Sequence, residues 1–155
     1  MIHKQRTHRR SRRGAVAVEF AIVAPVFLAI VLGVAEVSQL VEAQNLLETA
    51  AREGARFGAM DRTGFVDAGG ANAKLIQDVK NFLAAQGLSA DDVTVDVKHP
   101  GTDDAFDLDN PNNDLELFEV HVAFPYSSVT GHNLLDDYNL EAVVTFRNAR
   151  ATIAN

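Results

Sequence analysis

An apolar stretch follows the basic N-terminus of this chain, from Ala15 to Ala35, and Glu19 is its only charged residue. As an α-helix, 21 residues rising about 1.5 Å each would reach roughly 30 Å, which is the thickness of the hydrocarbon core of a bilayer. The 155 residues leave room beside it for one soluble domain with a modest core. The stretch therefore predicts a single membrane-spanning helix.

Charge sets the expected orientation of that helix. All 21 acidic residues follow Gly14, whereas six basic residues precede it: Lys4, Arg6, Arg9, Arg10, Arg12 and Arg13. Positive residues beside a membrane helix tend to stay in the cytoplasm, so we expect a cytoplasmic N-terminus, an inner-membrane anchor and an acidic extracytoplasmic domain. The basic segment is short and lacks aromatic residues, and topology therefore explains it better than nucleic-acid binding.

Residue types that support catalysis or metal binding are sparse. The chain has no cysteine, which excludes disulfides, thiol catalysis and cysteine zinc sites. His99, His121 and His132 lack the spacing of a metal site, and Ser127 with Ser128 lacks the glycine elbow of a serine hydrolase. We therefore expect a binding or structural protein with no enzymatic activity, no cofactor and no metal.

The junction between the basic and apolar segments resembles a known processing site. From Arg13 to Phe20 the sequence is similar to the prepilin-peptidase site of type IV pilin-like proteins, in which glycine ends a basic leader and glutamate is fifth in the mature chain. Through the apolar helix and the segment from Ala50 to Phe57, it resembles the TadE-like pseudopilins, or minor pilins, of bacterial tight-adherence pilus systems.

This resemblance implies specific roles for four residues. A membrane peptidase would cut after Gly14 and leave Ala15 as the new N-terminus, with Phe20 completing the recognition motif. Glu19 would pair with the terminal amine of a neighbouring subunit, which agrees with the high cost of an unpaired charge in lipid. The implied partners are prepilin peptidase, other pilins and pseudopilins, the pilus assembly machinery and the lipid bilayer, and the implied function is assembly of a pilus for surface attachment.

Other interpretations of the N-terminus remain open. A secretory signal could end at Gly33-Val34-Ala35, although the apolar run is longer than a signal core of 7 to 15 residues, and Ser11-Arg12-Arg13 weakly resembles a twin-arginine signal. Glu19 could reach the cytoplasmic interface without any partner. The chain could also be a permanent single-pass membrane anchor whose outer domain captures a ligand or partner and is not processed as a pilin.

After Ala35 the helical pattern continues and becomes amphipathic. We expect one helix from about Ala15 to Met60, with a bend or a melted turn at Pro25, where a backbone hydrogen bond is lost. Gly54 and Gly58 allow another backbone to pack closely against this helix. That neighbour is either the helix of an adjacent pilin or this protein's own sheet.

The remaining sequence predicts a second helix and three strands, hence an α+β fold with a small antiparallel sheet packed on the helices. The second helix is expected from Ala73 to Gln86, with Asn72 as N-cap and Gly87 ending it. Period-two alternation marks the strands, which contain Val93, Val95 and Val97, then Phe118, Val120, Val122 and Phe124, then Leu140, Ala142, Val144 and Phe146. The expected divisions are a leader (1–14), a membrane helix (15–35), an amphipathic stalk (36–60) and an extracytoplasmic domain (61–155).

One loop, 99–114, is rich in Asp and Asn. Oxygen-rich loops can hold calcium, but Pro111 occupies a position where an EF-hand needs a ligand, and the required glycine is absent. The sequence leaves two interpretations, a calcium site or a solvated or partly disordered loop.

Overall fold

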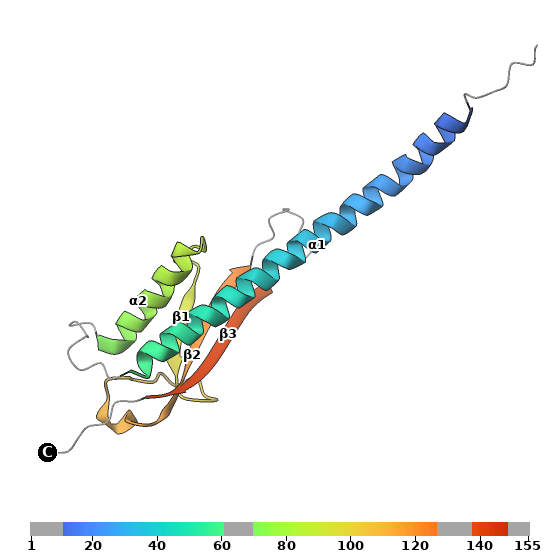
Figure 1. The fold of residues 1–155 in the computed structure, drawn as a ribbon. Coiled ribbons are helices and arrows are strands. Elements are labelled where there is room, and N and C mark those ends of the chain that lie inside the picture. Colours follow the sequence, from blue (N-terminus) through green and yellow to red (C-terminus); the bar gives the residue numbers. More distant parts are fainter. Residues whose placement is uncertain (1–10, 61–69, 127–137, 149–155) are drawn as a thin grey trace, which may run out of the picture. The chain divides into compact units, whose positions relative to one another are not determined.

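The computed structural model describes residues 11–60, 70–126 and 138–148, and only the backbone of 11–13. Its elements, in chain order, are α1 (Ser11–Gly58), α2 (Gly70–Ala85), β1 (Thr94–Lys98), the short 3-10 helix η1 (Pro111–Asn113), β2 (Leu117–Tyr126) and β3 (Tyr138–Arg147) (Figure 1). The predicted α+β fold, with a long N-terminal helix, a second helix and three strands, is confirmed. The chain forms two compact units, Met1–Gln39 and Leu40–Asn155, which we describe separately; we call the second the head.

Helix α1 contributes residues to both units. It was predicted from about Ala15 to Met60 and begins instead at Ser11 and ends at Gly58. The backbone stays helical through Pro25, so no melted turn forms there. Proline removes one N–H donor, and the helix tolerates that single loss.

The sheet of the head is antiparallel, with strand order β1-β2-β3. Val97 pairs with Val120, and Val120 pairs with Val144, so apolar residues of all three strands share one face. Successive side chains of a strand point to opposite faces, and burial alternates along β1 as the sequence predicted. This inner face is covered by α1 and α2.

The core of the head lies between the helices and the inner face of the sheet. Its helical members are mostly small on α1 and branched on α2: Ala43, Leu47, Ala50, Ala51 and Ala55 from α1, with Ala71, Leu75, Val79 and Leu83 from α2. Phe118, Val120 and Val122 of β2 are buried against them. Small residues on α1 let its backbone approach the sheet closely. This explains why most core positions of α1 hold alanine and not leucine.

The ends of α2 show one correct and one wrong prediction. Gly87 ends the helix with φ +91°, while Leu88 N donates to Leu83 O at 3.1 Å, a Schellman-type cap. Asn72 is not the N-cap, because the helix begins at Gly70. The side chain that accepts from the N-terminal amide is Asp109, whose Oδ2 lies 2.6 Å from Ala71 N.

The acidic loop 99–114 is folded against the head. Phe106 and Leu108 are fully buried in its core. Asn72 of α2 holds the backbone here, since its Nδ2 donates to Phe106 O at 2.6 Å and its Oδ1 accepts from Leu108 N at 2.9 Å. The expectation of a solvated or partly disordered loop is therefore wrong for Phe106 and Leu108, which are buried.

Candidate functional site

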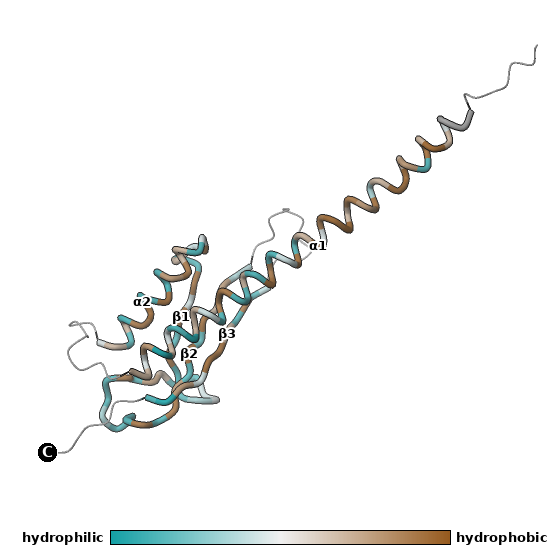
Figure 2. The backbone as a smooth tube through the Cα atoms, viewed as in Figure 1, coloured by the Kyte–Doolittle hydropathy of each residue, from teal (hydrophilic) through white to brown (hydrophobic). Residues whose placement is uncertain are grey.

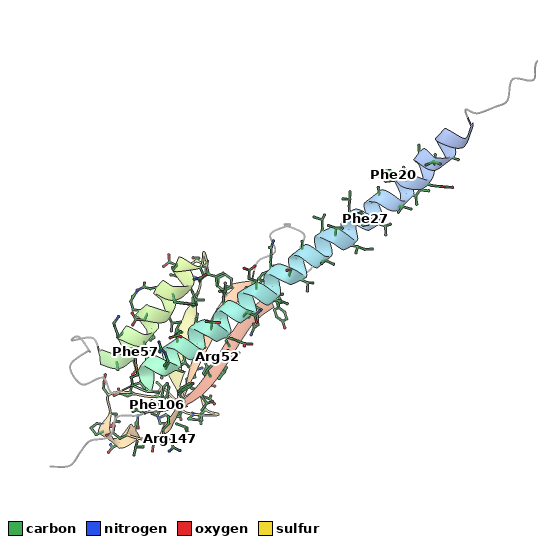
Figure 3. The ribbon with its side chains drawn as sticks, in the orientation of Figure 1. Phe20, Phe27, Arg52, Phe57, Phe106 and Arg147 are labelled. Carbon is green, nitrogen blue, oxygen red and sulfur yellow. The ribbon has the colours of Figure 1, made fainter. Side chains whose placement is uncertain are left out.

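The predicted processing and assembly residues all lie on the N-terminal part of α1. Gly14, Ala15, Glu19 and Phe20 are helical and exposed, and no atom outside the local helix lies within 4 Å of where a Cβ on Gly14 would stand. Phe20 is 71 % exposed. Figure 3 shows its side chain, like that of Phe27, pointing away from the helix with nothing of this chain against it. These residues have no packing role within the described chain.

The same part of α1 is apolar on every side. Its most apolar 18 residues have a mean hydropathy of 2.6, and none of that window is buried within the chain. Figure 2 shows the change of character along α1, from a mostly hydrophobic first half to a mixed second half. Soluble proteins rarely expose an apolar surface this large. By length and composition this helix could span a membrane.

Glu19 is the single charge inside that apolar surface. Four residues separate it from Gly14, so in a helix it lies on the same side as Ala15 and one turn further along. A carboxylate in lipid is costly unless it is paired or reaches the interface. The arrangement therefore places an acid one turn from the bond that the resemblance marks for cleavage.

Gly54 and Gly58 lie in the head, and both contact this protein's own core. A Cβ on Gly54 would stand 2.7 Å from Val79 Cγ2 of α2, and one on Gly58 would stand 2.6 Å from Phe118 Cζ of β2. Distances under 3.0 Å require the neighbour to move. The two glycines thus bring α1 close to α2 and to the sheet, which is a packing role within one chain.

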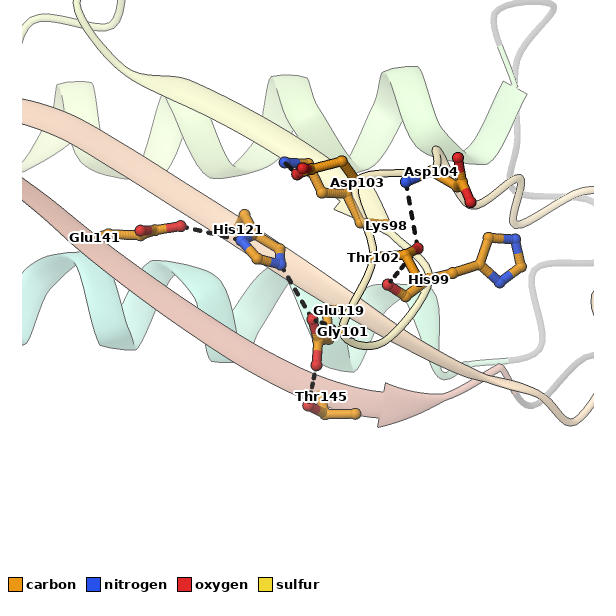
Figure 4. A network of polar contacts seen from close by, with 10 residues as sticks. All are labelled: Lys98, His99, Gly101, Thr102, Asp103, Asp104, Glu119, His121, Glu141 and Thr145. Atoms are coloured by element: carbon orange, nitrogen blue, oxygen red, sulfur yellow. Dashed lines mark hydrogen bonds and ion pairs between the residues drawn. The ribbon is translucent and has the colours of Figure 1, made fainter.

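The outer face of the sheet has a polar network that the sequence did not single out (Figure 4). His121 of β2 has a carboxylate at each ring nitrogen, Glu141 Oε1 at 3.1 Å from Nδ1 and Glu119 Oε2 at 3.2 Å from Nε2. Period-two alternation puts these residues on one face of the strands, so the pattern contains the signal. Only the cross-strand register shows that they touch.

Two pKa shifts accompany this network. Burial alone would raise the pKa of Glu119, but hydrogen bonds from His121, the Gly101 amide and the Thr145 hydroxyl together lower it below its ordinary value. The hydrogen bond from Lys98 Nζ to Asp103 raises the pKa of Lys98. Both shifts favour the charged forms, as expected for partners on a solvated sheet face.

Among its described residues, the head has a groove between two helices and no group of metal-ligating side chains. Among residues 11–60, 70–126 and 138–148, no three His, Asp or Glu side chains gather in a way that could hold a metal ion, and loop 99–114 is included in that range. A shallow groove of about 390 Å³ lies between α1 and α2, with a lining that includes Gly54, Phe57, Val79 and Phe82. It combines apolar side chains with Glu53, Arg56 and Asp78 and suggests no reaction.

One of three comparisons with known proteins found a match. No curated protein and no solved structure matches the chain. The model of one protein family, described as TadE-like protein, matches residues 14–56. That match covers less than a third of the 155 residues, begins at the glycine of the candidate cleavage site and ends in the packed part of α1. Residues 14–56 of this chain are therefore similar to TadE-like proteins, the family that the N-terminal sequence resembles.

Proposed function

We propose that this protein is a pseudopilin, or minor pilin, that a prepilin peptidase processes and that takes part in assembly of a tight-adherence pilus. The proposal is supported best by three features of the N-terminus that begin at or near the same residue. The family match starts at Gly14, and there the exposed apolar half of α1 also begins, with its one acid at the fifth position after the glycine. The proposed activity is binding and assembly, without catalysis by this chain.

Cleavage would hydrolyse the bond between Gly14 and Ala15. Water adds across it, so that Gly14 leaves with a carboxylate and Ala15 keeps an amine. In the uncut chain the bond lies within α1, close to Ser11, where the described part of the helix starts. Glycine weakens a helix by about 1 kcal/mol relative to alanine. Gly14 therefore lowers the cost of opening the helix here for a peptidase.

After cleavage, the ammonium of Ala15 and the carboxylate of Glu19 would be one helical turn apart. Glu19 would also lie near the positive end of the shortened helix, where an acid is favoured. A pair inside one chain or between neighbouring chains relieves the cost of the charge in lipid. We propose the pair between neighbours, because it would couple processing to assembly.

In this proposal the residues from Ala15 to Ala35 anchor the chain in the inner membrane, the basic leader stays in the cytoplasm and the head faces outward. Four of the basic residues, Lys4, Arg6, Arg9 and Arg10, lie outside the described residues, and the orientation rests on their sequence alone. The partners are the prepilin peptidase, other pilins and pseudopilins, and the pilus assembly machinery.

Processing is tested by coexpressing the full chain with a prepilin peptidase. We expect loss of about 1.8 kDa, the summed residue masses of a 14-residue leader that contains five arginines, and an N-terminus at Ala15. Gly14→Ala should block the cut, whereas Gly33→Ala, a matched change later in the same helix, should leave it intact. An uncut chain would favour a permanent membrane anchor with a binding domain, and a mature chain starting at Glu36 would indicate a secretory signal.

The role of Glu19 is tested separately, in the native host, with Glu19→Gln. We expect normal cleavage and loss of piliation, because the amide cannot neutralise a neighbouring ammonium. Glu42→Gln removes an exposed acid of the head portion of α1 and should leave piliation unchanged. Normal piliation by Glu19→Gln would exclude the proposed charge pair.

A further inference from the structure

The two edges of the head sheet differ. β1 has five residues, and its outer side is partly covered, since Lys98 forms a bridge with Ala105 and Phe106 N donates to Val97 O at 2.9 Å. β3 pairs with β2 over ten residues, and the part of the chain that the structure describes contains no strand on its other side. The β1 edge is therefore short and partly occupied, whereas the β3 edge is long and has no neighbouring strand among the described residues.

Helix α1 covers only the first half of β3. There, Leu140 and Ala142 are buried, and Gln44 Nε2 of α1 donates to Glu141 O at 3.0 Å. Further along, α1 lies over β2, because a Cβ on Gly58 would meet Phe118. The helix therefore crosses the sheet and leaves the second half of β3, residues 143–147, without a cover from α1. We call residues 143–147 the open β3 edge.

The apolar layer of the sheet is unfinished at this edge. Phe146 and Val144 pair with Phe118 and Val120 of β2, which are fully buried, yet Phe146 is 37 % exposed and Val144 is half-buried. Protected edges usually contain proline, lysine or a bulge. The open β3 edge contains no proline and no lysine, and its pairing with β2 has no bulge. One more strand would bury the apolar side chains and satisfy the edge backbone.

Charge restricts what that strand can be. Arg147 is the only charged residue of the open β3 edge, and within the described residues no ion pair involves it. Opposite charges on directly facing strands are favourable and like charges are not. A second copy in antiparallel register would have to supply Glu141, which lies in the half that α1 covers and contacts His121. An acid from a different protein fits better.

We propose that the open β3 edge binds an extended segment of a partner protein by strand addition. The segment places apolar side chains over Val144 and Phe146 and a carboxylate opposite Arg147. Backbone donors and acceptors repeating every 3.3 Å or so are matched by another extended chain, whereas lipid offers no such repeat. This inference does not depend on cleavage at Gly14, so either can fail without the other.

The test uses the full chain, labelled with nitrogen-15 in detergent micelles, and two synthetic peptides of alternating valine and threonine. One peptide has a glutamate positioned to face Arg147, and the other has lysine there. We expect the glutamate peptide to bind about fivefold more tightly and to slow amide exchange of residues 143–147 but not of β1. Arg147→Glu should reverse the preference, and Arg52→Glu, a charge reversal of similar exposure on α1, should not.

Three results would overturn the proposal. The first is equal binding of both peptides, and the second is binding that leaves exchange at residues 143–147 unchanged. The third is protection of residues 143–147 without any peptide in a chain that sediments as a dimer, because a second copy would then occupy the edge. Exchange at β1 reports that Arg147→Glu remains folded, which keeps a loss of binding interpretable.

Discussion

The two halves of α1 use similar residues in opposite surroundings. Ala15, Ala17 and Ala21 in the first half are exposed, whereas Ala50, Ala51 and Ala55 in the second half are fully buried in the head. Both halves are helical and rich in small apolar residues, but the first half is apolar on nearly every side and the second half is amphipathic. The second half packs on elements of its own chain. The first half buries nothing inside the chain, and by its length and composition it could span a membrane.

Replacing one phenylalanine in each half of α1's surroundings, Phe118 in the head and Phe27 in the apolar half, should give the largest difference in the free energy of unfolding. Phe118 is fully buried, and Phe118→Ala should destabilise the head by about 3–5 kcal/mol through lost contacts and a cavity. Phe27→Ala removes an exposed ring and should leave the unfolding of the head unchanged. Urea unfolding of the full chain in detergent, followed by near-UV circular dichroism, measures both. Equal destabilisation would contradict the division between the two halves.

Replacing a glycine in each half of α1 compares how closely the two parts of its backbone are packed. Gly58→Ala places a Cβ 2.6 Å from the Phe118 ring and should destabilise the head by about 1–3 kcal/mol. Gly33 has no such neighbour within 4 Å, and Gly33→Ala should be neutral or stabilise its helix by up to about 1 kcal/mol. The same unfolding assay applies. A stabilising Gly58→Ala would show that the close contact with Phe118 can relax without cost.

A smaller effect is expected from the cap of α2. Asp109→Ala removes the acceptor of the Ala71 amide and should cost about 0.5–2 kcal/mol. Asp91→Ala removes an exposed acid from the turn before β1 and serves as the matched control. Amide exchange along α2 should rise from its N-terminal end in Asp109→Ala only. Unchanged exchange there would mean that Gly70 and its neighbours hold the helix start without the cap.

The smallest effect concerns acid stability of the outer sheet face. The folded pKa of Glu119 lies below its ordinary value of 4.5, so its contribution is present above that pH and is lost as pH falls through the folded pKa. We expect Glu119→Gln to reduce stability by about 0.5–1 kcal/mol at pH 7 and by less at pH 3. Thermal unfolding of both proteins at the two pH values measures this, and a constant difference would contradict the assignment.

Much of the fold could be read from local patterns. Period-two alternation predicted all three strands, and Gly87 predicted the end of α2, because each depends on nearby residues. The start of α2 could not be predicted in this way. Asn72 resembles an N-cap in sequence, but it binds the backbone of Phe106 and Leu108, and the acceptor at the helix start comes from Asp109, far along the chain. Local propensity carries no information about such distant partners.

Some features of the candidate sites could likewise be predicted from the sequence, and others could not. Gly14, Glu19 and the apolar run lie close together in the sequence, so their spacing along a helix follows directly from helix geometry. The contacts of His121 with Glu119 and Glu141 depend on the register of β2 and β3. The sequence left two possible partners for Gly58, the helix of an adjacent pilin or this protein's own sheet, and the structure shows contact with Phe118 of its own sheet.

The sequence by itself determined a basic N-terminal segment, an apolar helix of bilayer length with one acid near its start, and an α+β head. These follow from hydropathy, charge and period, which are properties of neighbouring residues. Only the tertiary structure decided which small residues of α1 pack inside the head, which side chain caps α2 and which edge of the sheet has no further strand among the described residues. Those features depend on residues that are distant in sequence and meet only when the chain has folded.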